Sequence, residues 1–274
     1  MLRVNGAYLY ELGKTLQPLI RIDIKDGSLA EFYFQFLWAK QALNGFLYGS
    51  VFSESFRASA QAGQILLSEL SELAPDIEEE MDWDKTVPSW KISQVKTEFS
   101  KFEAVLIAEL QNSALYYASA KGGYDTPALT DNGEVIFPPD LGFKVPDAIA
   151  DVKAAARCIA FDLPTAAAFH LHRANEAVLR RYFDEVVGSK SRPKSNNMGD
   201  YINVMQTKQV GDPKVLSVLK SIKDLHRNPI MHPEERLDTV SEAISLLAAI
   251  RASIGYMLDR IESSEPPVVA PLPF

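Results

Sequence analysis

The helical pattern of the sequence breaks at Leu225-His226-Arg227-Asn228-Pro229-Ile230-Met231-His232-Pro233-Glu234. An apolar run with helical spacing precedes this stretch, and a second helical run follows it. Pro229 and Pro233 prevent an unbroken helix, because proline has no backbone N–H and the residue before it disfavours helical geometry. The stretch therefore predicts a break between two helices, with Arg227 and His232 five positions apart.

Outward from this break, the second half of the chain has the pattern of a series of amphipathic helices. Pro164 fits the first position of a helix, and Asp147 can cap an earlier one. Thr239 and Glu242 have the spacing of a capping box at the start of the last helix. The helices predicted on this basis cover 147–161, 164–187, 198–209, 213–228 and 240–260.

The first half of the chain also favours helices. Long apolar periodicities predict helices over 29–49, 54–73 and 91–120, which form a bundle or a docking layer. Two short runs, 20–24 and 134–137, have the pattern of possible strands beside turn residues. The expected fold class is therefore all-α, with at most a short strand or two.

Proline and glycine interrupt the helical periodicity once more, and this gives the expected domain organisation. An N-terminal helical region of 1–120, whose role is open, precedes a Pro/Gly-rich connector of 121–145. An antiparallel helical bundle is expected over 146–262, and a Pro-rich tail over 263–274.

Composition narrows the class of protein. The chain is 47% hydrophobic and 23% charged, as in globular proteins, and its one cysteine, Cys158, excludes an intramolecular disulfide and a cysteine metal cluster. No secretory signal is visible, and polar residues interrupt the most apolar window, 32–47, so we expect no membrane span and a cytoplasmic location. Residues 1–120 hold 10 Lys/Arg against 16 Asp/Glu, a charge of −6, whereas 146–262 hold 16 against 15, a charge of +1. The second half is the one whose charge permits contact with a polyanion.

The break holds two side chains suited to cleaving a phosphodiester bond. Arginine binds phosphate through two parallel hydrogen bonds, and histidine transfers protons near neutral pH. RNA supplies its own nucleophile, the 2′-hydroxyl, so Arg227 and His232 are a minimal metal-free set, and Asn228 could add a hydrogen bond. The alternative is a purely structural role, in which Arg227 and His232 neutralise the last carbonyls of a helix.

Residues Lys223–Glu234 resemble the R-x(4–6)-H signature of the HEPN superfamily, in the form with asparagine directly after the arginine. Residues 164–176 resemble an upstream helix of bacterial HEPN proteins, and the resemblance extends over 146–262. It implies an antiparallel helical bundle that forms a homodimer, in which the arginine and histidine of two protomers share one cleft. Family members are commonly metal-independent endoribonucleases of toxin–antitoxin, abortive-infection and antiviral systems. They need no cofactor, and a cognate antitoxin or regulatory protein is an expected partner.

Carried over residue by residue, the resemblance makes Arg227 the ligand of the scissile phosphate and His232 the acid/base. Asn228 becomes an accessory polar residue, and Glu176 becomes the acidic residue that orients Arg227. Other members of the superfamily have lost activity, so a non-catalytic module that binds a nucleotide, an RNA or a partner protein stays open. A third interpretation is an all-helical scaffold with a dimer surface in the N-terminal region.

Two further groups of polar residues have open interpretations. His172 and Glu176 share a helix face, and a metal site there would need at least one further ligand, which favours a helix-surface pair or a supporting contact behind another site residue. Glu176 and Arg180 also share a face, and this favours a buried or interface ion pair between them even more. The basic segment 188–195 carries Lys190, Arg192 and Lys194, which are possible RNA contacts or residues of a solvated loop.

Overall fold

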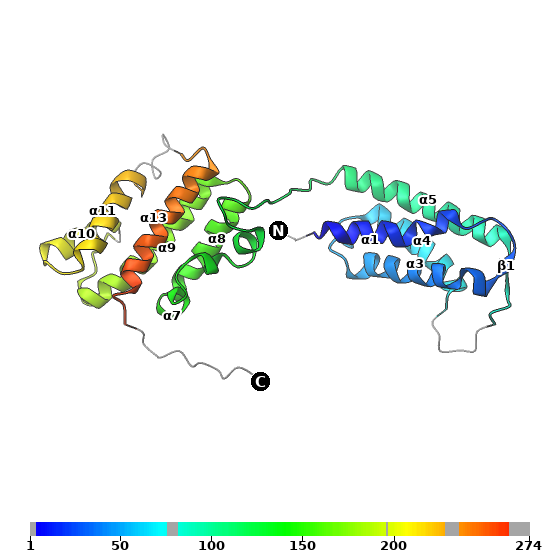
Figure 1. Cartoon of the computed structure of the whole chain (residues 1–274), viewed down its shortest axis with the longest axis horizontal. Coiled ribbons are helices and arrows are strands. Elements are labelled where there is room, and N and C mark those ends of the chain that lie inside the picture. The colour runs from blue at the N-terminus through cyan, green and yellow to red at the C-terminus, as the bar shows by residue number, and fades with distance from the viewer. Residues whose placement is uncertain (1–3, 76–81, 196, 228–235, 263–274) are drawn as a thin grey trace. The chain divides into compact units, whose positions relative to one another are not determined.

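The computed structural model describes residues 4–75, 82–195, 197–227 and 236–262, except the side chains of 225 and 226 (Figure 1). The chain forms two compact units, unit 1 (residues 1–116) and unit 2 (residues 117–274). Both are built almost entirely of helices in their described parts, and each has its own hydrophobic core. The all-α expectation is therefore confirmed.

Unit 1 packs three long helices around an aromatic core. Its elements are α1 (Gly6–Leu16), α2 (Pro18–Arg21), β1 (Gly27–Ser28), α3 (Leu29–Gly49), α4 (Arg57–Leu73), β2 (Thr86–Val87) and α5 (Ser89–Gln111). Phe46 of α3 is buried in this core, with its ring 6.2 Å from that of Phe52 and 5.7 Å from that of Phe102. The two strands pair antiparallel, with Gly27 opposite Val87.

The strand predicted over 20–24 is wrong. Pro18 starts the short helix α2, and the buried side chains, Leu19 and Ile22, are three positions apart, as one helical face requires. Ile20 and Ile24 are exposed instead. The alternation of apolar residues in this segment thus did not reflect one buried strand face.

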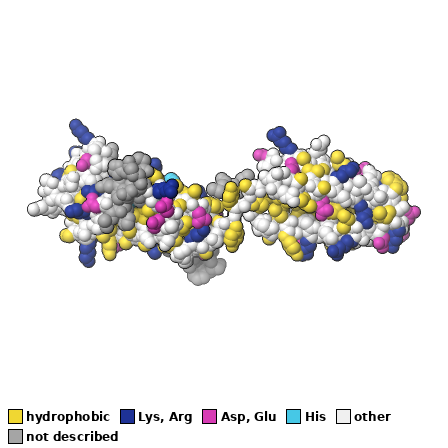
Figure 2. Space-filling model, turned by 90° about the horizontal axis from the view of Figure 1, so that it is seen from above, with side chains coloured by type: hydrophobic (Ala, Val, Ile, Leu, Met, Phe, Trp, Pro, Cys, Tyr) yellow, Lys and Arg dark blue, Asp and Glu magenta, His cyan; other side chains and the backbone are white. Residues whose placement is uncertain are grey.

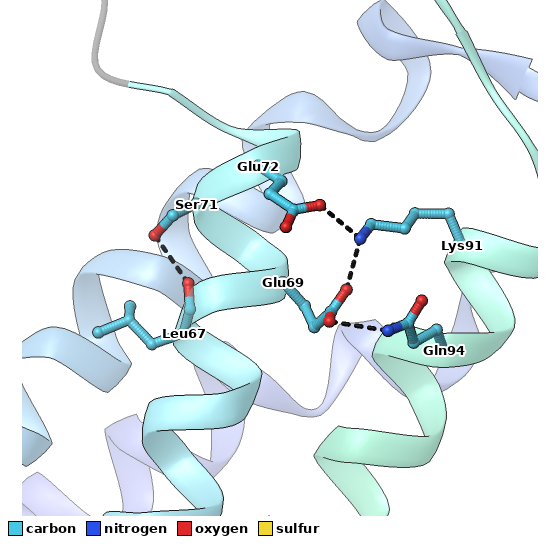
Figure 3. Close-up of polar contacts among 6 residues, drawn as sticks. All are labelled: Leu67, Glu69, Ser71, Glu72, Lys91 and Gln94. Carbon is cyan, nitrogen blue, oxygen red and sulfur yellow. Dashed lines mark hydrogen bonds and ion pairs between the residues drawn. The ribbon is translucent and has the colours of Figure 1, made fainter.

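A polar network joins α4 to α5 (Figure 3). Lys91 Nζ lies 2.6 Å from Glu69 Oε2 and 2.6 Å from Glu72 Oε2, and Gln94 donates to the other oxygen of Glu69 at 2.7 Å. Burial alone lowers the pKa of Lys91, but the two carboxylates outweigh it and raise that pKa above its ordinary value. The ion pairs therefore keep this mostly buried lysine charged and fix the register of the two helices.

The start of α4 is capped by a side chain from another helix. Its N-cap residue, Phe56, offers no side-chain acceptor, so the first N–H groups of the helix need another partner. Glu109 of α5 accepts from the backbone of Ala58 at 3.1 Å and of Ser59 at 3.0 Å, and also from the Ser59 hydroxyl. Burial raises the pKa of Glu109, but these hydrogen bonds outweigh it and hold the pKa below its ordinary 4.5.

Replacing Glu109 by alanine is expected to destabilise unit 1 by about 1–2 kcal/mol at neutral pH, because the Ser59 hydroxyl and two N–H groups lose their acceptor. The measurement is urea unfolding followed by tryptophan fluorescence, since Trp38, Trp83 and Trp90 all belong to unit 1.

The contribution of Glu109 to the stability of unit 1 is expected to decrease at low pH. The folded pKa of Glu109 is depressed, so its contribution is complete above the unfolded pKa and is lost as the pH falls through the folded pKa. Glu109→Gln should flatten this acid dependence, whereas Glu103→Gln, which changes an exposed carboxylate of the same helix, should not. An equal effect of both substitutions would contradict the capping role.

The helices of unit 2 surround a second hydrophobic core. Its elements are α6 (Thr126–Thr130), η1 (Gly133–Ile136), α7 (Leu141–Lys144), η2 (Pro146–Ala148), α8 (Ile149–Ala160), α9 (Pro164–Val186), η3 (Ser189–Ser191), α10 (Met198–Thr207), α11 (Pro213–Ile222), η4 (Lys223–Arg227) and α13 (Val240–Leu258). Tyr182, near the end of α9, accepts from the backbone N–H of Asp212 at the start of α11, and Arg260 after α13 pairs with Asp212 at 2.7 Å. The helix α11 therefore runs antiparallel to α9 and α13 (Figure 1).

The connector predicted over 121–145 belongs to unit 2. Leu129, Ile136 and Leu141 from this segment are buried in the same core as α8 and α9. The strand predicted over 134–137 is wrong, because 133–136 form a 3-10 turn that packs on α8. A side chain at Gly133 would come within 2.8 Å of Ala156, and this close approach explains the glycine there.

Two helix starts predicted from the sequence are confirmed, and one is wrong. Pro164 lies in the first turn of α9, and Thr239 and Glu242 form a complete capping box on α13. Asp147 does not cap α8, because Pro146 starts a 3-10 turn that places Asp147 inside the helical segment. Among the described residues, only α13 is long and apolar enough to cross a membrane, and its buried residues make it a core helix of unit 2.

Candidate functional site

The predicted helix of 213–228 is realised as two pieces. The α-helix α11 ends at Ile222, and η4 continues it as a π turn that ends at Arg227. A π turn takes one more residue than an α turn and often occurs at functional sites. Arg227 thus lies beyond the end of the regular α-helix, at the last residue of the π turn.

The side chain of Arg227 is held by Glu176, from the middle of α9. Arg227 Nε donates to Glu176 Oε1 at 2.6 Å, and the side chains are 21% and 16% exposed. The other oxygen of Glu176 lies 4.0 Å from the guanidinium of Arg180. The predicted pairing of Glu176 with Arg180 is therefore the looser of two contacts, and the tighter one links residues 51 positions apart.

His232 and Asn228, the other two residues predicted for this site, lie outside the described residues. The structure therefore brings together Arg227 and Glu176, the pair that joins the end of η4 to α9.

A buried polar layer lies on α9 beside Glu176. Asn175 is fully buried, and its side-chain amide has no hydrogen-bond partner within the described part of the chain. His172, one turn earlier, is also fully buried, so of the alternatives left open for His172 the surface pair with Glu176 is wrong. Its helix turns His172 toward the core side that Leu171 and Ala174 share. Two polar side chains thus interrupt the core next to the Arg227–Glu176 pair.

A second charged group lies at the junction of α8 and α9. In Asp151 of α8, Oδ1 lies 2.8 Å from Nδ1 of His170 and accepts a hydrogen bond from Nε of Arg173 at 3.1 Å; both partners belong to α9. Asp151 is only 14% exposed, whereas Arg173 is 69% exposed. Sequence reasoning missed this group, because only the i,i+3 spacing of His170 and Arg173 is visible in the sequence, and it does not identify Asp151 as their partner.

The basic segment 188–195 is partly ordered by its own contacts. Arg192 makes a two-pronged ion pair with Asp184 of α9, with Nε at 2.8 Å from Oδ1, and this pairing raises the pKa of Arg192. Lys190 and Lys194 are exposed. Of the three predicted RNA contacts, Arg192 is thus already committed to a carboxylate of the protein.

Charges of both signs are mixed on the surface of unit 2, as Figure 2 shows for one face of it. Among the described residues, no three histidine, cysteine, aspartate or glutamate side chains gather as a ligand set for a metal ion. No family model, no curated protein and no solved structure matches the chain. The candidate site therefore rests on its own geometry and on the resemblance of the segment around Arg227.

Proposed function

We propose that the chain is a metal-independent endoribonuclease of the HEPN type, in which Arg227 binds the scissile phosphate of RNA. The observation that carries the proposal is the Arg227–Glu176 pair at the end of a π turn. A lone exposed arginine moves among many rotamers, whereas one held by a half-buried carboxylate is fixed before substrate arrives. Glu176 also has the orienting role that the resemblance implies.

The chemistry divides between the two ends of the break. Arg227 uses Nε for Glu176, and Nη1 and Nη2 bind two oxygens of the phosphate and stabilise the charge that develops on the phosphorane. His232 transfers the protons: one leaves the attacking 2′-hydroxyl, and one reaches the departing 5′-oxygen. Asn228 adds a hydrogen bond. The products are a 2′,3′-cyclic phosphate and a 5′-hydroxyl, and no metal is required.

One chain supplies one half of the active site in this proposal. A single histidine cannot act as base and acid at the same moment, and a second copy provides the other group. We therefore propose a homodimer through unit 2, with the two breaks facing each other. An antitoxin or another regulatory protein that covers this cleft would control a toxin or antiviral effector of this kind.

A second function, a non-catalytic module that binds RNA, a nucleotide or a partner protein, is favoured by one observation. Glu176 neutralises the charge of Arg227. An ion pair of this kind can have a purely structural role, in which it holds α9 against the end of η4. This alternative predicts binding without turnover.

Incubation of the purified chain with RNA in EDTA separates the two functions. Cleavage to fragments with cyclic phosphate ends, at a rate that EDTA does not change, is expected for the endoribonuclease. Binding of intact RNA with no fragments over a wide range of protein concentrations would support the module. Cleavage that EDTA abolishes would contradict the proposed mechanism.

A further inference from the structure

The outer face of α9 carries a row of arginines that extends beyond Arg227. Arg173 and Arg180 are seven residues apart, or two helical turns and about 10 Å, and so lie on one face. Glu176 lies between them on the same face and holds Arg227. Three guanidinium groups, from Arg173, Arg227 and Arg180, therefore follow one another along the helix. We call these three residues the α9 arginine strip.

The carboxylates that accompany the strip lie deeper than the arginines at its two ends. Asp151, which holds Arg173, is 14% exposed, and Glu176 is 16% exposed, whereas Arg173 is 69% and Arg180 is 44% exposed. A molecule that approaches this face meets the cations first. Asp151 holds Arg173 and Glu176 holds Arg227, each through Nε, so these two side chains lose little entropy when a phosphate binds their terminal nitrogens.

We propose that the α9 arginine strip is a binding track for the phosphate backbone of single-stranded RNA, with Arg173 and Arg180 on either side of the phosphate held by Arg227. The proposal rests on the proposed function, because that function places the RNA at Arg227. The strip spans about three nucleotides of a stacked strand, at roughly 3.4 Å each. Guanidinium groups bind phosphate oxygens through two parallel hydrogen bonds, and the proposed function already places a phosphate of RNA at Arg227, so we take RNA as the ligand.

The test measures the salt dependence of binding with a short single-stranded RNA that is 2′-O-methylated, so that it cannot supply the nucleophile. Replacing both end residues, Arg173→Gln with Arg180→Gln, is expected to reduce the slope of log K against log salt by about 1.4, or roughly 0.7 for each lost phosphate contact. The fold should survive, because Asp151 keeps His170 and Glu176 keeps Arg227. The double substitution to lysine retains the charges and should retain the slope.

Arg181→Gln is the matched control. Arg181 is the neighbour of Arg180 on the same helix and is also ion-paired, with Glu185 at 3.0 Å, but it lies about 100° away around the helix axis. It should leave the slope unchanged. Equal slopes for the wild type and the Arg173→Gln, Arg180→Gln protein would overturn the track, as would an equal loss in the control.

The outcomes for the strip and for catalysis are separate. A wild type that cuts RNA in EDTA, together with an unchanged slope in the double variant, would leave the proposed function standing and reject the track. A reduced slope in a protein that never cleaves RNA would support the track and reject the endoribonuclease. Loss of binding to an acidic protein, with RNA binding intact, would also reject the track.

Discussion

Arg227→Ala should lower the rate of RNA cleavage in EDTA by roughly 10²–10³-fold, the usual cost of removing one group that stabilises a developing oxyanion. Binding of RNA should weaken far less, because Arg173 and Arg180 remain. The reason is that the phosphate gains most of its charge stabilisation in the transition state, where the guanidinium is needed most. The measurement is single-turnover cleavage of a labelled RNA, with wild type and variant at saturating protein.

Controls separate lost chemistry from lost structure. Arg227→Lys keeps the charge but loses the two-pronged geometry and should remain strongly impaired. Glu176→Gln should impair cleavage less than Arg227→Ala, because the guanidinium stays but is less firmly oriented. His232→Ala should reduce cleavage at least as much as Arg227→Ala. Unchanged cleavage in Arg227→Ala or His232→Ala, with far-UV circular dichroism like that of the wild type, would reject the site.

Phe46→Ala should destabilise unit 1 by about 3–5 kcal/mol, since it empties a fully buried ring site and breaks two aromatic contacts. With an m-value near 2 kcal/mol/M, the urea midpoint should fall by about 2 M. Tryptophan fluorescence reports this transition selectively, because all three tryptophans lie in unit 1. Circular dichroism, to which both units contribute, should show a second transition that does not move.

Tyr48→Ala is the matched control for this experiment. Tyr48 is an aromatic residue of the same helix, but it is 63% exposed, and its loss should change the stability by less than about 0.5 kcal/mol. A second circular dichroism transition that moves together with the fluorescence transition in Phe46→Ala would contradict independent folding of the two units.

The long helices are predictable from the sequence because their burial is periodic. Pro164 and the Thr239–Glu242 box locate two helix starts, since capping depends on residues only a few positions apart. The predicted helix over 91–120 ends earlier, at Gln111, close to the end of unit 1, where no core remains for its apolar residues. The connector differs from its prediction for a related reason, since proline and glycine mark turns but do not reveal whether those turns pack into a core.

The candidate site is predictable only in part. The resemblance implied that Glu176 orients Arg227, but their contact joins two helical segments distant in the chain, and no spacing rule of the sequence alone encodes it. The same limit hides Asp151, which meets His170 and Arg173 only across a helix interface. The burial of His172 is not predictable either. Four of the five residues from 171 to 175 are buried, so other helices cover most of the circumference of α9 at this level. Burial of this kind depends on the neighbouring helices.

The direction in which Arg227 leaves the helix axis depends on how many residues each turn of η4 contains. Each residue of an α-helix advances the chain by about 100° around the axis, and a π turn accommodates one residue beyond the regular number. If the same five residues formed a regular α turn instead, the arginine would lie about a quarter-turn away from Glu176. The same pair of side chains would then be present in the sequence and absent as a pair in space.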